Sequence, residues 1–321
     1  MGSNRIDVHH HFVTDFYANA VVASGGDPSG WEIPKWSPEL DANFATKYEV
    51  GTSLLSLTAP GACILKDPTA CAKLARDCNE YAAAMRDKEP EKYGILAALP
   101  NLHDKENVLK EIAYCDDKLK VDGFTLFSRY GPGNHYLGHP DFKDIWDELE
   151  RRKAVVFIHP THPVDTNLVN PGLPQPVIDY PFETTKAAVD LIASRTVKRC
   201  PNVKIILSHA GGTLPYLVGR PATVLPYLDK TWNPEDFIED ASNLYYDTAV
   251  AGSKNVLLVI EKFAKPGHVL YGSDYPYAGP GIITYHTDGL DKYPFETKNF
   301  LDDVNRNNAL KLFPRLAARM K

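Results

Sequence analysis

The stretch IDVHHHF, residues 6–12, decides the fold, because a short apolar strand ends there in three histidines. Side chains alternate between the two faces of a strand, so His9 and His11 point to one side and His10 points to the other. Only His9 and His11 can therefore share a metal ion. Two such histidines at the carboxyl end of a strand are typical of a site at the mouth of an α/β barrel. A solvated histidine run would look the same, so the interpretation needs support from elsewhere in the chain.

Three more apolar runs end in a residue able to bind a metal ion. VVFIHP carries His159, KIILSHAGG carries His209, and VLYGSDYP carries Asp274. Each residue alone would be interpreted as a hydrogen-bonded histidine or a turn-forming aspartate. Their shared position at strand ends favours a single site instead.

Outward from these strand ends, short apolar runs alternate with amphipathic stretches, which is the pattern of βα units around a parallel sheet. Helical spacing is clear in KENVLKEIAYC (105–115), PDFKDIWDELERRK (140–153) and TTKAAVDLIAS (184–194). The predicted strands are Arg5–His10, Thr52–Thr58, Tyr93–Leu99, Gly123–Ser128, Ala154–His159, Lys204–His209, Leu244–Thr248 and Val269–Ser273.

This pattern predicts an α/β fold, a (β/α)8 TIM barrel, formed by one domain over residues 1–321. An open doubly wound sheet is the alternative, but no GxGxxG or Walker sequence follows a strand. Residues 12–48 and 159–181 show little periodicity. We predict that the first of these segments is a lid-like insertion after the first strand, with a mobile loop as the alternative.

Composition excludes several classes of protein. The net charge is −6, which argues against the basic surface of a nucleic-acid-binding protein. No apolar run reaches the roughly 20 residues that span a bilayer, and no signal peptide opens the chain, so we expect a cytosolic protein without a membrane partner. The five cysteines form no CxxC pair, which argues against a disulfide framework or a zinc ribbon.

The motifs IDVHHHF, FIHP, SHAGG and YGSDYP, in this order and on these strands, resemble the amidohydrolase superfamily. The resemblance is to the branch related to aminocarboxymuconate semialdehyde decarboxylase and the metal-dependent benzoate decarboxylases, and it covers essentially the whole chain. It implies that one divalent metal ion is bound by four residues and that His209 stands beside it as an acid/base group. The implied ligands are His9, His11, His159 and Asp274.

The predicted fourth strand, GFTLFSRYG, has no lysine at its end that could bridge a second ion, so we expect a mononuclear site. Three imidazoles and one carboxylate favour Zn²⁺, with Mn²⁺ as the alternative.

Three further residues are candidates for contact with the substrate. Thr213 is a plausible N-cap that would place Arg220 about two turns along a helix, where the resemblance implies an arginine near the substrate carboxylate or the subunit contact. A solvated position is the alternative for Arg220. Arg129 is a second candidate for anion binding, or else part of a structural ion pair. Phe182, in YPFETT, would stack on a planar substrate or pack in the core.

The resemblance implies nonoxidative decarboxylation of a 2-hydroxybenzoic acid, a small aromatic carboxylic acid, with Asp274 as the proton donor and His209 beside it. Within the branch, the motifs are most similar to those of fungal members that convert 6-methylsalicylate to 3-methylphenol and CO₂. The alternatives are another hydroxybenzoate, hydrolysis of a lactone or amide by metal-activated water, or a catalytically silent barrel kept for binding. The resemblance also implies a homodimer.

Overall fold

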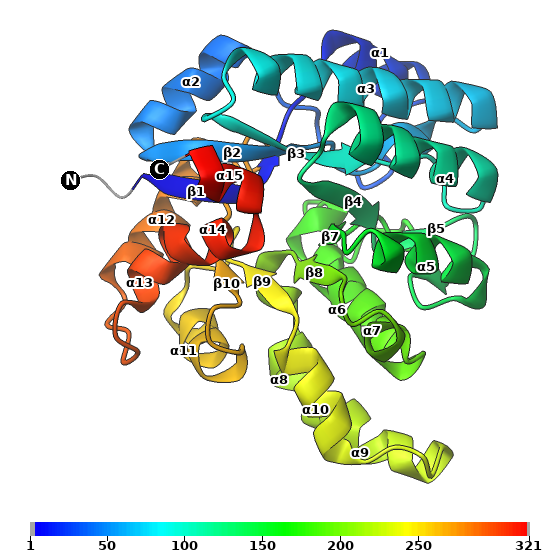
Figure 1. Ribbon diagram of the computed structural model, residues 1–321, viewed down its shortest axis with the longest axis vertical. Coiled ribbons are helices and arrows are strands. Elements are labelled where there is room, and N and C mark those ends of the chain that lie inside the picture. Colours follow the sequence, from blue (N-terminus) through cyan, green and yellow to red (C-terminus); the bar gives the residue numbers. More distant parts are fainter. Residues whose placement is uncertain (1–3, 320–321) are drawn as a thin grey trace.

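The computed structural model describes residues 4–319, and Figure 1 shows a ring of strands with helices around it. Eight strands pair in parallel in the order β1-β2-β3-β4-β7-β8-β9-β10. Their bounds are β1 Arg5–His11, β2 Val50–Ser56, β3 Tyr93–Ala98, β4 Gly123–Phe127, β7 Val155–His159, β8 Lys204–Leu207, β9 Tyr245–Asp247 and β10 Val269–Leu270. A small antiparallel hairpin of β5 (Arg129–Tyr130) and β6 (His135–Tyr136) follows β4.

Hydrogen bonds between β1 and the chain just after β10 bring the two ends of the sheet together. The N–H of Val8 donates to the carbonyl of Tyr271 over 3.0 Å, and the N–H of His11 donates to the carbonyl of Tyr275 over 2.7 Å. The eight parallel strands therefore form a nearly closed barrel. The predicted TIM-barrel fold is confirmed.

Helices connect the strands and cover the outside of the barrel (Figure 1). The longer ones are α1 Asp15–Ala23, α2 Pro38–Lys47, α3 Pro68–Lys88, α4 Lys105–Tyr114, α5 Lys143–Arg151, α6 Asp179–Ala193, α9 Gly219–Leu228, α10 Pro234–Ser242, α11 Lys254–Phe263 and α12 Pro280–Lys292. The short ones are α7 Thr196–Arg199, α8 Leu214–Leu217, α13 Phe300–Asp302, α14 Asn308–Leu312 and α15 Pro314–Arg319. The helices predicted over 105–115, 140–153 and 184–194 correspond to α4, α5 and α6.

The last helices close the end of the barrel opposite the strands' carboxyl ends. Leu312 and Phe313 join an apolar cluster with strand residues such as Ile6 and Phe157. Arg315 on α15 donates to Asp122 and to the carbonyl of Tyr93, which stand where β4 and β3 begin. Because this end is covered, the carboxyl ends of the strands remain for a functional site.

Several predicted strands end earlier than expected, and two of these, the sixth and the eighth, precede site residues. The sixth stops at Leu207 and the eighth at Leu270. His209 and Asp274, which follow them, have φ angles of 55° and 63°, which no strand residue adopts. The chain therefore turns away from the sheet at these positions.

The helix expected from Thr213 to Arg220 is formed as two pieces, and Val218 between them has helical φ and ψ angles. α8 ends at Leu217 and α9 begins at Gly219, and Pro221 lacks the N–H that would bond the carbonyl of Leu217. Arg220 therefore lies in the first turn of α9. Thr213 precedes α8, but its side chain makes no capping hydrogen bond.

Among the helices described within residues 4–319, none is both long and apolar enough to cross a membrane. The cytosolic location and the single domain over residues 1–321 stay predictions.

Candidate functional site

The first strand supplies two imidazoles to one small space. β1 places the Nε2 atoms of His9 and His11 3.1 Å apart, and both side chains are fully buried. Oδ1 of Asp274 lies 3.3 Å from each of these nitrogens. His159, at the end of β7, completes a group of four whose ligand atoms all lie within 4.8 Å of one another. The structure thus brings together the four residues that the sequence predicts as metal ligands.

The ring nitrogen that faces away from this group orients the histidines. His9 Nδ1–H donates to Oδ2 of Asp247 over 2.8 Å, and His159 Nδ1–H donates to the carbonyl of Pro160 over 2.7 Å. Because carboxylate and carbonyl oxygens only accept, the proton stays on Nδ1. The lone pair of Nε2 is then free for a metal ion.

His11 is oriented through a hydroxyl group. Its Nδ1 lies 2.9 Å from Oγ of Ser56, while that hydroxyl donates its own proton to the carbonyl of His10 over 3.0 Å. Oγ can therefore only accept from His11. The Nε2 atoms of all three histidines therefore face the centre of the group.

The electrostatics of the group favour a positive charge at its centre. Burial alone would lower the pKa of His9, but the carboxylates of Asp247 and Asp274 outweigh it and raise the pKa to about 10. Burial and the neighbouring imidazoles of His11 and His9 hold the pKa of His159 well below its usual value. For Asp274, burial would raise the pKa, yet the adjacent histidines lower it well below its usual range. The buried carboxylate of Asp247 and the partly buried carboxylate of Asp274 thus attract a cation to this point.

The chemistry of the donors fits a metal ion. Three imidazole nitrogens and one carboxylate oxygen suit a single Zn²⁺ or Mn²⁺ ion. Among the described residues, those that line the adjoining pocket include no lysine that could bridge a second ion.

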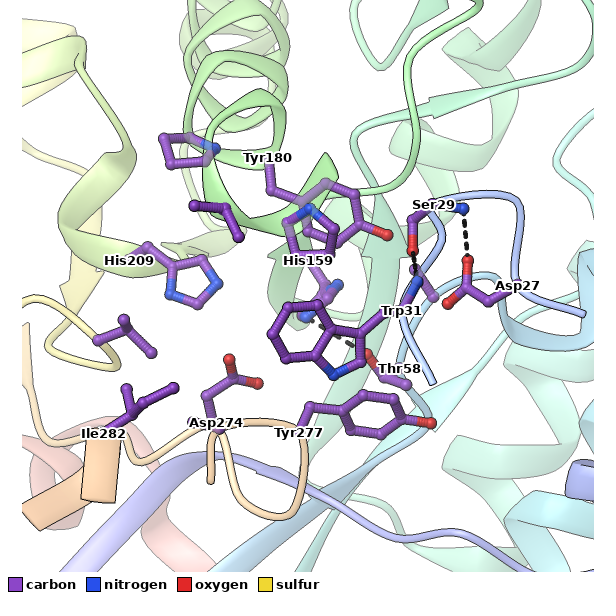
Figure 2. A pocket seen from close by; sticks show the side chains of 16 residues that line it. Asp27, Ser29, Trp31, Thr58, His159, Tyr180, His209, Asp274, Tyr277 and Ile282 are labelled. Atoms are coloured by element: carbon purple, nitrogen blue, oxygen red, sulfur yellow. Dashed lines mark hydrogen bonds between the residues drawn. The ribbon is translucent and has the colours of Figure 1, made fainter. Parts of the chain in front are cut away.

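His209 stands next to this group, in the turn after β8. Its Nδ1–H donates to the carbonyl of Ala249 over 2.9 Å, so Nε2 is its free ring nitrogen. Figure 2 shows its ring and the carboxylate of Asp274 facing the same space. Gly212, with a φ of 64°, makes the tight turn after His209 feasible, because a Cβ there would lie 2.0 Å from the carbonyl oxygen of Pro181.

Asp247, at the end of β9, was missed by the sequence reasoning. Its carboxylate accepts Nδ1–H of His9, the N–H of His209 over 3.0 Å and the N–H of Ala249 over 2.9 Å. Asp247 therefore orients both His9, a proposed ligand, and His209, the proposed acid/base residue. Its place at the end of a predicted strand was the signal that could have found it.

His10 lies away from the ligands, as strand alternation predicts. Its Nδ1 is 3.1 Å from Oδ2 of Asp7, and its Nε2 is 2.6 Å from Oδ1 of Asp41 on α2. Burial would lower the pKa of His10, but Asp41 and Asp7 raise it to about 9. The resulting ion pairs join β1 to the insertion that follows it.

A cavity of about 300 Å³ opens in front of His159, His209 and Asp274. The two irregular segments form much of its wall (Figure 2). The segment 12–48 contributes Asp27, Ser29 and Trp31, the segment 159–181 contributes Pro176, Val177, Tyr180 and Pro181, and the chain after β10 contributes Tyr277, Ala278 and Ile282. The carbonyl of Ser29 accepts the N–H of Gln175 over 3.0 Å, which joins the two segments. Movement of the insertion as a lid stays a prediction.

The three residues predicted to contact a substrate do not line this cavity. Arg129 is buried, and its guanidinium donates to the carbonyls of His162 and Gly131 over 2.9 and 2.8 Å. Phe182 on α6 and Arg220 on α9 are exposed. The proposed contacts of Arg129, Phe182 and Arg220 with a substrate therefore stay predictions, because none of the three lines the cavity of its own chain.

Comparison with known proteins gives concordant results. The model of the amidohydrolase family matches residues 6–315. A Penicillium expansum protein named 6-methylsalicylic acid decarboxylase is 52% identical over 97% of this chain and 97% of its own length. An Aspergillus aculeatus protein that also carries this name is 49% identical over 97% and 96% of the two chains.

The fold recurs in a crystal structure of a dihydroxybenzoic acid decarboxylase from Polaromonas with bound manganese and the inhibitor 2-nitroresorcinol. The TM-score is 0.84 at 20% identity, over 98% of this chain and 97% of that one.

Replacement of Asp247 by asparagine tests how far the site depends on this carboxylate. An amide offers only one oxygen, so its NH₂ group would face at least one of the three donors that Asp247 accepts. We expect Asp247→Asn to weaken Zn²⁺ or Mn²⁺ binding by about 10–100-fold, measured by competition with a chelator. Asp288→Asn, an exposed aspartate on α12, is the matched control and should bind metal like the wild type. Unchanged affinity in Asp247→Asn would contradict this role.

Proposed function

The chain belongs to the amidohydrolase family, and from that premise we propose that it is a carboxy-lyase that decarboxylates a 2-hydroxybenzoic acid without an oxidant. The observation that carries the proposal is the position of Asp274 and His209. Asp274 is one of four potential metal donors, His209 stands beside them, and both face a cavity with aromatic walls.

The substrate that we favour is 6-methylsalicylate, which would give 3-methylphenol (m-cresol) and CO₂. Two relatives that are 52% and 49% identical carry the corresponding name. The rings of Trp31, Tyr180 and Tyr277 offer flat walls for a planar substrate (Figure 2). Other hydroxybenzoates differ by one ring substituent, which a pocket distinguishes by about 1–3 kcal/mol.

We propose that His9, His11, His159 and Asp274 hold one divalent ion. Three imidazoles favour Zn²⁺, and Mn²⁺ is the alternative, since it is bound in the Polaromonas structure. When bound, the ion would supply a Lewis acid that withdraws negative charge from the oxygens of the substrate.

Decarboxylation needs a proton at the ring carbon that bears the carboxylate. A C–H bond forms there first, which interrupts the aromatic system. The C–C bond to the carboxylate then breaks, its electron pair returns to the ring, and CO₂ leaves. A positioned acid lowers the barrier of the first step.

We assign the proton donor to Asp274, because its carboxylate lines the cavity. The adjacent histidines hold the pKa of Asp274 well below its usual range even though burial opposes this, so Asp274 is a carboxylate in the free protein and must receive the proton that it delivers. The phenolic O–H of the substrate can supply that proton. His209, whose ring is fixed through the carbonyl of Ala249, can accept or return it through Nε2.

We also propose that a second copy of the chain covers the exposed face of α8 and α9. Tyr216 is 89% exposed, Tyr227 82% and Leu228 78%. Figure 1 shows α9 and α10 reaching away from the barrel. Exposed apolar groups gathered on one helix face are typical of association surfaces. Arg220 lies on the same face by helical spacing, so contact with a substrate would require the partner copy.

A substrate panel tests the proposed reaction. We expect the purified protein to release CO₂ from 6-methylsalicylate with a kcat/KM about 10–200-fold above that for salicylate, which lacks the methyl group. Protein stripped of metal by a chelator is the control and should be inactive until Zn²⁺ or Mn²⁺ is restored. Hydrolysis of a lactone or amide without CO₂ release would contradict the proposal and favour a hydrolase.

Asp274→Asn tests the proton donor. An amide cannot deliver the proton, so we expect kcat for CO₂ release to fall by at least about 10²-fold at saturating metal. Binding of 3-methylphenol, measured by calorimetry, should change much less. Asp288→Asn is the matched control. Near-normal turnover in Asp274→Asn would transfer the role to His209, and His209→Gln would then lose activity.

The homodimer is tested by light scattering coupled to size-exclusion chromatography. We expect the wild type to elute with twice the chain mass of 35.7 kDa. The double variant Tyr227→Asp/Leu228→Asp should elute as a monomer, because it places two charges in the proposed interface. Val22→Asp on α1, also an exposed apolar position, should remain dimeric. A monomeric wild type would contradict the proposal.

A further inference from the structure

A second group of histidines lies on the rim of the barrel mouth and takes no part in lining the cavity. His103 lies in the loop between β3 and α4, His135 begins β6, and Asp141 lies in the short 3-10 helix Pro140–Phe142. These segments follow the carboxyl ends of β3 and β4. The group therefore lies at the same end of the barrel as the candidate active site, but on different elements.

The distances within this rim group are close to those of a coordination shell. Nε2 of His103 and Nδ1 of His135 are 3.2 Å apart, and Oδ2 of Asp141 is 3.8 Å from Nδ1 of His135. The three ligand atoms all lie within 4.8 Å of one another. Zinc bonds of 2.0–2.1 Å place tetrahedral ligand atoms about 3.3 Å apart. A small adjustment of side chains would therefore bring all three onto one ion.

Neighbouring groups hold these side chains in place. The ring of His139 stacks on that of His135 at 4.0 Å with an interplanar angle of 10°, and its Nδ1 accepts the N–H of Asp141 over 3.3 Å. Gly131 has a φ of 73°, and a Cβ there would lie 2.8 Å from Nε2 of His103. A side chain at position 131 would thus displace the imidazole from its place in the rim group.

The charge of the rim group points to a cation rather than to a simple hydrogen bond. Within residues 4–319, no lysine or arginine pairs with Asp141, whose carboxylate has only histidines within ion-pair distance. A hydrogen bond between His103 and His135 would leave the carboxylate 3.8–3.9 Å from both rings, which is too far for it to accept a hydrogen bond. An ion between the three groups would engage the carboxylate and both imidazoles.

We propose that the rim group is a second metal site, in which His103, His135 and Asp141 bind a divalent transition-metal ion of the zinc class. Two imidazole nitrogens and one carboxylate oxygen suit such an ion, with water completing the shell. The ion would tie the β3–α4 loop to the β5–β6 hairpin. That hairpin carries Tyr136, which donates to Glu183 on α6 over 3.0 Å. The site therefore stabilises the mouth of the barrel and is independent of the chemistry inside it.

Zinc stoichiometry tests the proposal on the full-length protein prepared without a histidine tag. After equilibrium dialysis against Zn²⁺ and elemental analysis, we expect two equivalents per chain in the wild type. The double variant His103→Gln/His135→Gln should bind one, because the candidate active site is untouched. His268→Gln, a histidine near the start of β10 at the other end of the barrel, is the matched control and should bind two.

A second variant separates loss of the site from loss of the fold. Asp141→Asn keeps the size of the side chain and should weaken the second equivalent while leaving the first. Circular dichroism checks that each variant is folded. In crystals grown with Zn²⁺, an anomalous peak is expected between His103 and His135. One equivalent in the wild type, or two in the folded double variant, would overturn the proposal.

Discussion

The hydrogen bond from Nδ1–H of His9 to Asp247 is the interaction on which the candidate active site depends most. Asp247 also accepts the N–H of His209 and of Ala249, so one buried carboxylate fixes groups from β1, from the turn after β8 and from its own strand. A buried carboxylate without partners would cost several kcal/mol, and three donors offset that cost. The same bonds fix the tautomer of His9 and aim its Nε2 at Asp274.

The contacts that close the barrel also assemble the candidate active site. Asp7, on β1, accepts the N–H of His9 over 3.2 Å and the N–H of Ser273 over 3.0 Å. His9 is itself a proposed ligand, and Ser273 directly precedes another, Asp274. The segment after β10 is thus bound to β1 by contacts that also set the distance between ligands. A barrel that opened at this seam would lose the site before it lost its remaining strands.

The sequence predicts the strands and the grouping of His9, His11, His159 and Asp274 well, because both depend on local pattern. Strand alternation separates His10 from His9 and His11, and apolar runs locate His159 at a strand end and Asp274 just beyond one. The left-handed turns at His209 and Asp274 are not visible in such a pattern, so the predicted strands run too far. Arg220 shows a second limit. A motif can identify an arginine, but whether its side chain is exposed depends on tertiary packing.

The residues of the cavity wall fall into two groups, and the sequence predicts the position of one group better than that of the other. The donors and His209 stand on strand ends or in the short turns that follow them. Trp31 and Tyr180 belong to two long loops whose positions depend on contacts between them, such as the bond from Gln175 N–H to the carbonyl of Ser29. Substitutions in these loops can therefore change which ring substituent fits without moving the donors. The type of reaction is therefore easier to infer from this sequence than the identity of the acid. The reaction depends on residues at or near strand ends, whereas the choice of acid depends on how the loops pack.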